Sequence, residues 1–413
     1  MNDKFLWGAS IATYQTDGCP GTQWAEWEKT NAKRLASEYE KKFSFVPNYK
    51  DFLLEGEDPN NYICGLGIQH RKHYVEDFKL LKSLNINAFR FSIEWGRVEP
   101  EEGKFSEEEI KFIKRYLLEL KKHNITPVVS LWHWTMPTWF TNRGGFENKS
   151  NVKLFVRYCE YVLNALKDDI VYILTLNEPM IYTGISYLFG EWPPQKKSFT
   201  KCLGISRHLI YAHNQVYKTA KSINPSFQIS IAHNTGTTEL GDKKIKTKLA
   251  RAFSVYRRDT HFLKSTYKYM DFLGINWYNH DTFINGKVKN PCAIMNDLGW
   301  DARPYDIHII IEQLYKKYHL PILITENGLA DAADTRRKWW IEETMKAIEV
   351  AQNNGVQMLG YLHWSAFDNF EWDKGFWPRF GLIAIEPKTL KRTIRPSAKW
   401  YAEQLKQRRD EPK

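Results

Sequence analysis

Residues 321–329 read PILITENGL, an apolar run that ends in Glu326, Asn327 and Gly328. A short, continuous apolar segment followed by turn residues is typical of a parallel strand that is buried on both faces. A lone carboxylate at its end has an ordinary explanation, because strand ends meet solvent and charged residues gather there. The rest of the sequence has to show whether Glu326 is such a surface charge or half of a catalytic pair.

Seven other short apolar segments alternate with amphipathic helical patterns along the chain. The eight predicted strands cover residues 5–10, 88–93, 126–134, 172–179, 228–233, 272–278, 321–328 and 357–364. Helical patterns between them cover residues 73–85, 106–124, 151–167 and 337–355. The second pattern begins with Ser106 and has Glu109 three positions later, which is a capping box, and the last ends on Gly355.

The strand–helix units follow one another without a linker rich in Pro, Gly or Ser. They predict an α/β fold, a single (β/α)8 TIM barrel that forms one domain over residues 1–413. Residues 18–68 are the longest excursion and are expected to decorate the first loop between a strand and a helix. A doubly wound open sheet is the structural alternative, but the Gly-rich fingerprint expected after its first strand is missing.

Polar and aromatic side chains gather where the predicted strands end. In a barrel of this kind the chemistry lies at the carboxyl ends of the strands. The residues at those ends are Arg90, Glu94, His133, Trp134, Asn177, Glu178, Asn276, Tyr278, Glu326 and Trp364. Ordinary surface charges would not concentrate on one rim from six strands, so we expect the active site there.

Glu178 and Glu326 end the fourth and the seventh predicted strands. Two carboxylates on one rim suit glycoside cleavage, because one can protonate the departing oxygen while the other attacks the anomeric carbon or activates water. The acid needs a raised pKa, which the apolar residues flanking Glu178 favour. The other carboxylate has to stay ionised, and Arg90 and Tyr278 are candidates to stabilise it.

Seven segments of the chain match one known family in order. They are FLWGASIATYQTDG (5–18), HYVEDFKLLKSLNINAFRFSIEWGRVEPEEG (73–103), LWHWTMPTWF (131–140), TLNEP (175–179), ITENG (324–328), HWSAFDNFEWDKGFWPRFGL (363–382) and RPSAKWY (395–401). Together they resemble glycoside hydrolase family 1, the β-glucosidase type, nearly end to end. The resemblance implies a retaining β-glycosidase that acts on β-glucosides, with β-galactosides or β-fucosides as secondary substrates.

The resemblance also implies a role for each site residue. Glu178 would be the general acid/base and Glu326 the nucleophile, while Asn177 would hold the hydroxyl beside the anomeric carbon. The residues implied to orient the nucleophile are Arg90, Asn276 and Tyr278. Those implied to bind the sugar are Gln15, His133, Trp134, Asn177, Trp364, Glu371 and Trp372, with Trp364 as the platform under the ring.

Three positions depart from the usual family pattern: QTDG (15–18), Thr135 in HWTMP and Trp277 in INWY. They neighbour the reacting groups, so they bear on aglycone preference and packing rather than on reaction type. The loop after the fourth strand and residues 234–271 are short for the family. Short loops suggest a more open or more mobile cleft and weaker activity than usual.

Two alternative functions stay open. Glu371 would repel a 6-phosphate, whereas the nearby Lys374 and Arg379 keep a 6-phospho-β-glycosidase open. The other alternative is a catalytically weak sugar-binding barrel, although such a protein would not require both Glu178 and Glu326.

The 413-residue chain carries a formal charge of +11 and has a pI of about 9.1. Its basic residues are dispersed among acidic ones, and the densest runs, KKIKTK (243–248) and KQRR (406–409), resemble solvated helix faces or a tail. No recognition module with interleaved aromatic residues accompanies them, so nucleic acid is not an expected partner, and a membrane is not expected as a partner either. The expected partner is a small β-glycoside substrate, and the oligomeric state is left open.

The cysteines and the N-terminus indicate a cytoplasmic protein. The five cysteines show no C-x-x-C pattern and no metal spacing, which favours reduced thiols; they are Cys19, Cys64, Cys159, Cys202 and Cys292. MNDKFLWGAS (1–10) lacks the pattern of a secretion signal, and no stretch is apolar enough to span a membrane. The 12 His show no ligand spacing and no Gly-rich phosphate loop appears, so no metal or organic cofactor is expected.

Overall fold

The computed structural model describes residues 5–289 and 294–410. Nine strands form one sheet in the order β5-β4-β3-β2-β1-β9-β8-β6-β7. Because β5 also pairs with β6, all of these strands except β7 close into a parallel barrel. The strands are β1 (Leu6–Ser10), β2 (Ala88–Ser92), β3 (Thr126–Ser130), β4 (Tyr172–Asn177), β5 (Gln228–Leu240), β6 (Leu273–Ile284), β7 (Lys287–Val288), β8 (Ile322–Asn327) and β9 (Met358–Trp364). The predicted (β/α)8 barrel is confirmed.

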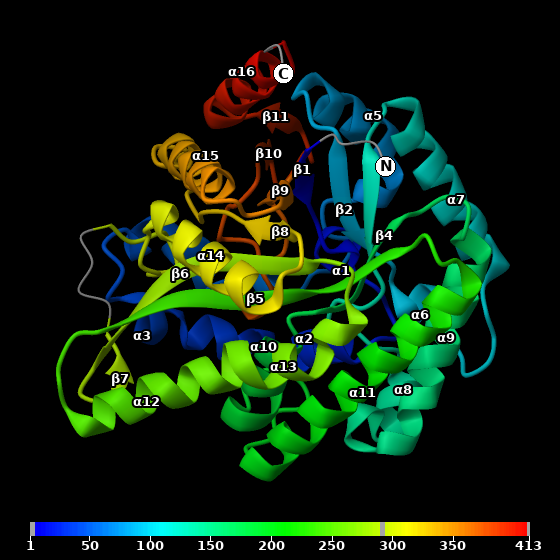
Figure 1. The fold of residues 1–413 in the computed structure, drawn as a ribbon, viewed down its shortest axis with the longest axis horizontal. Helices are drawn as coiled ribbons and strands as arrows, with labels where there is room; N and C mark the ends of the chain where they lie inside the picture. The colour runs from blue at the N-terminus through cyan, green and yellow to red at the C-terminus, as the bar shows by residue number, and fades with distance from the viewer. Residues whose placement is uncertain (1–4, 290–293, 411–413) are drawn as a thin grey trace.

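All eight predicted strands are present, but three of them end more than two residues from the predicted position. The third ends at Ser130, so the prediction that it reached residue 134 is wrong; residues 131–134 belong to the loop that follows. β5 and β6 continue past residues 233 and 278 because they remain paired with each other, as far as Leu240 opposite Phe283. Figure 1 shows this ribbon running out of the barrel toward α12 and β7.

Helices cover the outside of the barrel and fill the loops at its rim (Figure 1). The longer ones are α2 (Gln23–Ser37), α5 (His70–Ser83), α7 (Glu107–Lys122), α9 (Val152–Leu166), α11 (Phe199–Ile223), α12 (Ile245–Val255), α14 (Ile307–Tyr318), α15 (Arg337–Asn353) and α16 (Pro396–Asp410). The shorter ones are α1 (Thr13–Asp17), α3 (Tyr39–Phe43), α4 (Leu53–Gly56), α6 (Trp95–Val98), α8 (Thr138–Asn142), α10 (Pro179–Thr183) and α13 (His261–Thr266). A small hairpin, β10 (Ile383–Ile385) with β11 (Arg392–Ile394), precedes α16.

The predicted helix ends have the expected capping. Ser106 Oγ accepts a hydrogen bond from the Glu109 backbone N at 3.2 Å, which satisfies one of the free amides at the start of α7. Gly355 follows α15 with a φ of +86°, a conformation that glycine adopts without a Cβ clash. The excursion over residues 18–68 contains α2, α3 and α4 and lies between β1 and α5, as predicted.

One layer of apolar side chains fills the interior of the barrel. Each barrel strand contributes one side chain to it, and for β6 this is Phe272, the residue just before the strand. These residues are Leu6, Ala88, Val128, Leu174, Ala232, Phe272, Leu323 and Leu362, all buried. Gly8 lets the strands approach here, since a Cβ at that position would lie 2.2 Å from the Ala88 carbonyl oxygen. This packed layer closes the barrel interior, and the polar residues lie on the side of it where the carboxyl ends of the strands are.

Four of the five cysteines fall within the described residues. They are Cys19, Cys64, Cys159 and Cys202, and each is a buried free thiol; Cys292 lies outside the described residues. Within the described part of the chain, no helix is long and apolar enough to cross a membrane.

Candidate active site

Arg90, on β2, connects four strands at the rim of the barrel. Its side chain is fully buried, and its Nη1 donates hydrogen bonds to Glu326 Oε1 and to the Thr325 carbonyl, the latter at 3.2 Å. Nη2 donates to Asn177 Oδ1 at 2.6 Å, and Nε donates to Ser130 Oγ at 3.0 Å. A buried guanidinium whose donors are satisfied in this way holds a fixed positive charge beside Glu326.

Glu326, on β8, has a second hydrogen bond opposite Arg90. Tyr278, on β6, donates its hydroxyl to Glu326 Oε2 at 2.7 Å. Burial raises the pKa of Glu326, while Arg90 and the Tyr278 hydroxyl oppose that rise because both stabilise the carboxylate. The side chain is therefore held in one orientation by partners that favour its ionised form.

Glu178 lies between β4 and α10 in a different environment. Its Oε1 accepts hydrogen bonds from the amide groups of Asn276, at 2.8 Å, and Asn234, at 3.1 Å. Burial, together with the negative charge of Glu326, raises the pKa of Glu178 to about 8. Near neutral pH Glu178 is therefore largely protonated, while the partners of Glu326 stabilise the charged form of that carboxylate, and two such environments suit an acid and an anion in one site.

Three residues of the rim adopt backbone conformations that side chains other than glycine rarely take. Trp134, Glu178 and Trp372 have φ values of +73°, +39° and +51°. Such conformations cost on the order of 1 kcal/mol or more each and persist where the surroundings enforce them, often at functional sites. At Glu178 the chain turns directly from the strand into α10, whose first residue is Pro179.

Two of the predicted sugar-binding residues carry a buried polar atom that has no protein partner within the described residues: Gln15 Oε1 and His133 Nδ1. Gln15 donates its amide to the Phe370 carbonyl at 2.6 Å and lies 3.4 Å from Glu371 Oε2. His133 Nε2 accepts from the Asn177 amide at 2.9 Å, so its Nδ1 is the protonated nitrogen. Because buried polar atoms normally have partners, both atoms are suited to bind hydroxyl groups of a ligand.

Burial also shifts the pKa values of two further groups here. Burial, and then the charge of Arg90, lowers the pKa of His133 well below its usual range, so its imidazole is neutral. Burial raises the pKa of Glu371 to about 8, against the opposing charge of Lys374. A neutral imidazole and a largely protonated carboxyl group suit hydrogen bonds with uncharged hydroxyls.

Aromatic rings form the walls of the site. The Trp372 ring lies 5.8 Å from the His133 ring and nearly parallel to it, and 4.9 Å from the Trp134 ring. Trp134 is fixed by its indole NH, which donates to the Asn177 carbonyl at 2.8 Å. Trp364 closes another side, with its ring 6.1 Å from that of His133.

These groups surround a cavity of about 340 Å³ at the carboxyl ends of the strands. Eight predicted site residues line it: His133, Trp134, Glu178, Tyr278, Glu326, Trp364, Glu371 and Trp372. The other four, Gln15, Arg90, Asn177 and Asn276, lie behind them and hydrogen-bond to residues of the lining. All twelve predicted site residues are thus brought together, whereas Glu94, also near the end of a predicted strand, is buried against Thr135 instead.

The sequence model of the family described as Glycosyl hydrolase family 1 matches residues 1–274 and 242–410. The chain belongs to glycosyl hydrolase family 1. The resemblance predicted from the motifs is confirmed, and the chain is a glycosidase of this family.

Similar proteins match this chain over nearly its whole length. Beta-glucosidase A of Acetivibrio thermocellus is 26% identical, and the match covers 97% of this chain and 97% of the relative. A 6-phospho-beta-galactosidase of Clostridium acetobutylicum is 25% identical over 97% of this chain and 96% of its own length. Among solved structures, a beta-glycosidase from Pyrococcus horikoshii superposes with a TM-score of 0.84 at 28% identity, covering 99% of this chain and 97% of that one.

Several residues that line the family 1 cavity were not predicted. Asn234 hydrogen-bonds to Glu178 and lies one residue past the predicted end of the fifth strand, so a longer strand would have revealed it. The cavity lining also includes Ile181, Arg257 and Trp300. These residues do not lie at the end of an apolar run, so the strand pattern does not mark them.

The residues that depart from the family 1 pattern take packing positions. Trp277 is fully buried and stacks on Trp340, with ring centroids 5.7 Å apart, and does not line the cavity. Thr135 donates its hydroxyl to both carboxylate oxygens of Glu94, at 2.9 and 2.8 Å. Asp17 accepts from the Thr16 hydroxyl at 2.8 Å.

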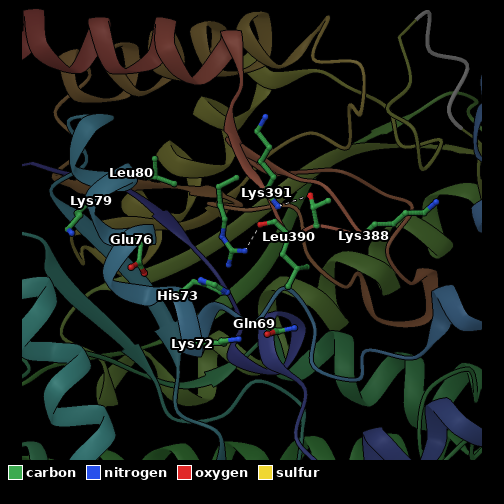
Figure 2. A pocket seen from close by; sticks show the side chains of 11 residues that line it. Gln69, Lys72, His73, Glu76, Lys79, Leu80, Lys388, Leu390 and Lys391 are labelled. Carbon is green, nitrogen blue, oxygen red and sulfur yellow. Dashed lines mark hydrogen bonds between the residues drawn. The ribbon is translucent and has the colours of Figure 1, made fainter.

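Another hollow, of about 710 Å³, lies on the outer surface between α5 and residues 388–392. Figure 2 shows Lys72, Lys79, Lys388 and Lys391 around it, with Glu76 as its one carboxylate. It lacks the pair of carboxylates, the aromatic walls and the buried partnerless atoms of the rim cavity. The rim cavity is therefore the candidate active site.

Proposed function

We propose that the chain is a retaining β-glycosidase that hydrolyses terminal, non-reducing β-D-glucosyl residues, with β-galactosides or β-fucosides as secondary substrates. The observation that carries the proposal is a pair of carboxyl groups on one cavity in opposite environments. Glu326 has a cation and a hydroxyl donor, whereas Glu178 has only amide donors and a pKa of about 8. The proposal takes residues 1–413 as one domain.

In the first step Glu326 attacks the anomeric carbon, and the bond from that carbon to the leaving oxygen breaks. Glu178 transfers its proton to that oxygen, so the aglycone leaves as a neutral alcohol. The sugar is then bound to Glu326 as an ester with inverted configuration.

In the second step Glu178, now ionised, removes a proton from a water molecule whose oxygen attacks the anomeric carbon. The bond between Glu326 and the sugar breaks, and the carboxylate returns to Arg90 and Tyr278. Two inversions restore the β configuration. Glu178 regains its proton from the water, which completes the cycle.

The surrounding residues take positioning and binding roles in this proposal. Arg90 and Tyr278 keep Glu326 ionised and oriented, and Asn276 orients Glu178. Asn177, which Arg90 and Asn276 hold in place, binds the hydroxyl next to the anomeric carbon. The remaining sugar hydroxyls and the ring face are assigned to Gln15, His133, Trp134, Glu371, Trp372 and Trp364.

Glu371 favours an unphosphorylated sugar. Lys374 lines the cavity, but its Nζ is ion-paired with Asp373 at 2.5 Å, and Arg379 pairs with Glu55 at 3.1 Å. Neither cation is therefore left to neutralise a phosphate beside Glu371. The 6-phospho-β-glycosidase alternative is nevertheless tested directly, because a 6-phospho-beta-galactosidase of Clostridium acetobutylicum matches 97% of this chain.

The test is hydrolysis of p-nitrophenyl β-glucoside, β-galactoside and 6-phospho-β-glucoside by the purified chain. We expect kcat/KM for the glucoside to exceed that for the phosphoglucoside by roughly 10²-fold, because burying a phosphate costs free energy unless a cation is free to pair with it, and Lys374 and Arg379 are already paired. A preference for the phosphorylated substrate would contradict the proposed specificity. Failure to hydrolyse any of the three would favour a catalytically weak sugar-binding barrel.

A further inference from the structure

The outward face of α12 is apolar. Ile245, Leu249 and Phe253 are 76%, 65% and 46% exposed, and Tyr256, in the π-helical segment Tyr256–Thr260 that continues the helix, is 53% exposed. Residues three and four positions apart share one side of a helix, so these side chains form a single stripe. Phe199, at the start of α11, extends it, because its ring lies 6.3 Å from that of Phe253. The α12 surface is the set Phe199, Ile245, Leu249, Ala252, Phe253 and Tyr256.

The opposite side of α12, which faces the outer ribbon of β5 and β6, is polar. Thr247 is the one buried residue of the helix, and its hydroxyl oxygen accepts a hydrogen bond from the Gly286 backbone N at 3.0 Å. Arg251 donates to the hydroxyl and the carbonyl of Thr238 at 2.9 and 3.2 Å. A surface helix normally turns its apolar stripe toward the core, so α12 has the reverse orientation.

Lysines border the apolar stripe. Lys246 and Lys248 lie on its two sides, and Lys243 and Lys244 precede the helix; all four are exposed. None of the four forms an ion pair within residues 5–289 and 294–410. The neighbouring Asp242 carboxylate accepts from the backbone N of Asn285, at 2.6 Å, and of Lys244, at 2.9 Å. The patch thus combines exposed apolar side chains with a net positive border.

We propose that the α12 surface docks on an anionic lipid surface. Its apolar side chains would enter the boundary between headgroups and acyl chains, and the lysines would contact lipid phosphates. A second copy of this chain fits less well, because a two-fold contact through α12 would bring the same four lysines of each copy together. Since no described helix can cross a membrane, the contact is peripheral.

Docking would hold the rim cavity beside the lipid headgroups. Ser254 of α12 and Arg257 of the π-helical segment that continues it line the cavity, while Phe253 and Tyr256 are exposed on the outer side. Figure 1 shows α12 at the lower edge of the molecule, below the ribbon of β5 and β6. The same short segment therefore connects the docking surface with the candidate active site.

The test is co-sedimentation of the purified full chain with vesicles of phosphatidylcholine, with and without about 30 mol% phosphatidylglycerol. We expect binding to the anionic vesicles alone, and its loss at high salt. The double variants Leu249→Ser/Phe253→Ser and Lys246→Glu/Lys248→Glu should each bind at least tenfold more weakly. The control is Leu118→Ser on α7, another exposed leucine (55%, against 65% for Leu249) away from the α12 surface, which should bind like the parent.

Circular dichroism melting would show that each variant is folded, and sedimentation velocity would report the oligomeric state. The proposal is overturned if the parent ignores anionic vesicles, or if the folded Leu249→Ser/Phe253→Ser variant binds them as well as the parent. It is also overturned if the parent is a dimer that this variant converts to a monomer, since the occupant would then be a second copy. None of these outcomes depends on glycosidase activity.

Discussion

A Glu326→Gln variant is expected to hydrolyse β-glucosides roughly 10⁴-fold more slowly than the parent chain, because no carboxylate is left to form the glycosyl ester. The amide keeps the size of the side chain and can still hydrogen-bond to the Tyr278 hydroxyl. It carries no charge for Arg90, which remains buried, so a moderate loss of stability is also expected. The measurement is kcat/KM for p-nitrophenyl β-glucoside, together with a thermal melt.

The matched control is Glu94→Gln. Glu94 is another buried glutamate near the rim, but it bonds to Thr135 and does not line the cavity. We expect this variant to stay within a few-fold of the parent. If Glu326→Gln retained parental activity, or if Glu94→Gln lost as much as Glu326→Gln, the assignment of the nucleophile would be wrong.

A Glu178→Gln variant is expected to separate the two steps of the reaction. With a leaving group as good as p-nitrophenolate the first step needs little acid assistance, so kcat/KM should change modestly. The second step needs Glu178 as base, so kcat should fall by roughly 10² to 10⁴-fold and KM should fall with it, because the ester accumulates. With an alkyl β-glucoside, whose leaving oxygen requires a proton, kcat/KM should fall by a similar factor.

The same variant tests the pH dependence. The first step requires protonated Glu178, whose pKa is raised to about 8 by burial and by the charge of Glu326. The protonated fraction falls as pH rises through that value, so kcat/KM of the parent for an alkyl glucoside should fall about tenfold per pH unit above about 8. Glu178→Gln should lack this alkaline limb. A variant that kept it would assign the limb to another group, such as Glu371.

The barrel and the two carboxylates could be predicted because their signals are local. Each barrel strand is a short apolar run, and Glu178 and Glu326 stand immediately where such runs end. The position of Arg90 in the middle of its run, fully buried, follows from the same pattern once the barrel is assumed.

The outer ribbon of β5 and β6 could not be predicted in this way. Residues 234–240, NTGTTEL, are mostly polar and small, and they pair outside the apolar interior, so no apolar period marks them as a strand. Asn234 was missed for this reason. The positive φ values of Trp134 and Trp372 likewise depend on tertiary packing, since nothing local to a tryptophan favours that conformation.

The sequence pattern could not predict that the apolar face of α12 is exposed. The run KKIKTK was interpreted as a solvated helix face, which describes its lysines but not Ile245. The spacing of the apolar residues is that of an ordinary amphipathic helix, and such a helix is expected to pack inward. Only the contacts of Thr247 and Arg251 show that the polar side faces the outer ribbon of β5 and β6.

The central claim is that one acidic side chain bonds covalently to the sugar while its neighbour handles the proton. Peptide mass spectrometry after incubation with an activated 2-deoxy-2-fluoro-β-glucoside measures this directly, since the fluorine slows release of the ester. The account predicts a single fluoroglucosyl adduct on the peptide that contains Glu326, absent from Glu326→Gln. An adduct on another residue would contradict it. A chain that carries no adduct and releases α-glucose as the first product from an ordinary β-glucoside would also contradict it.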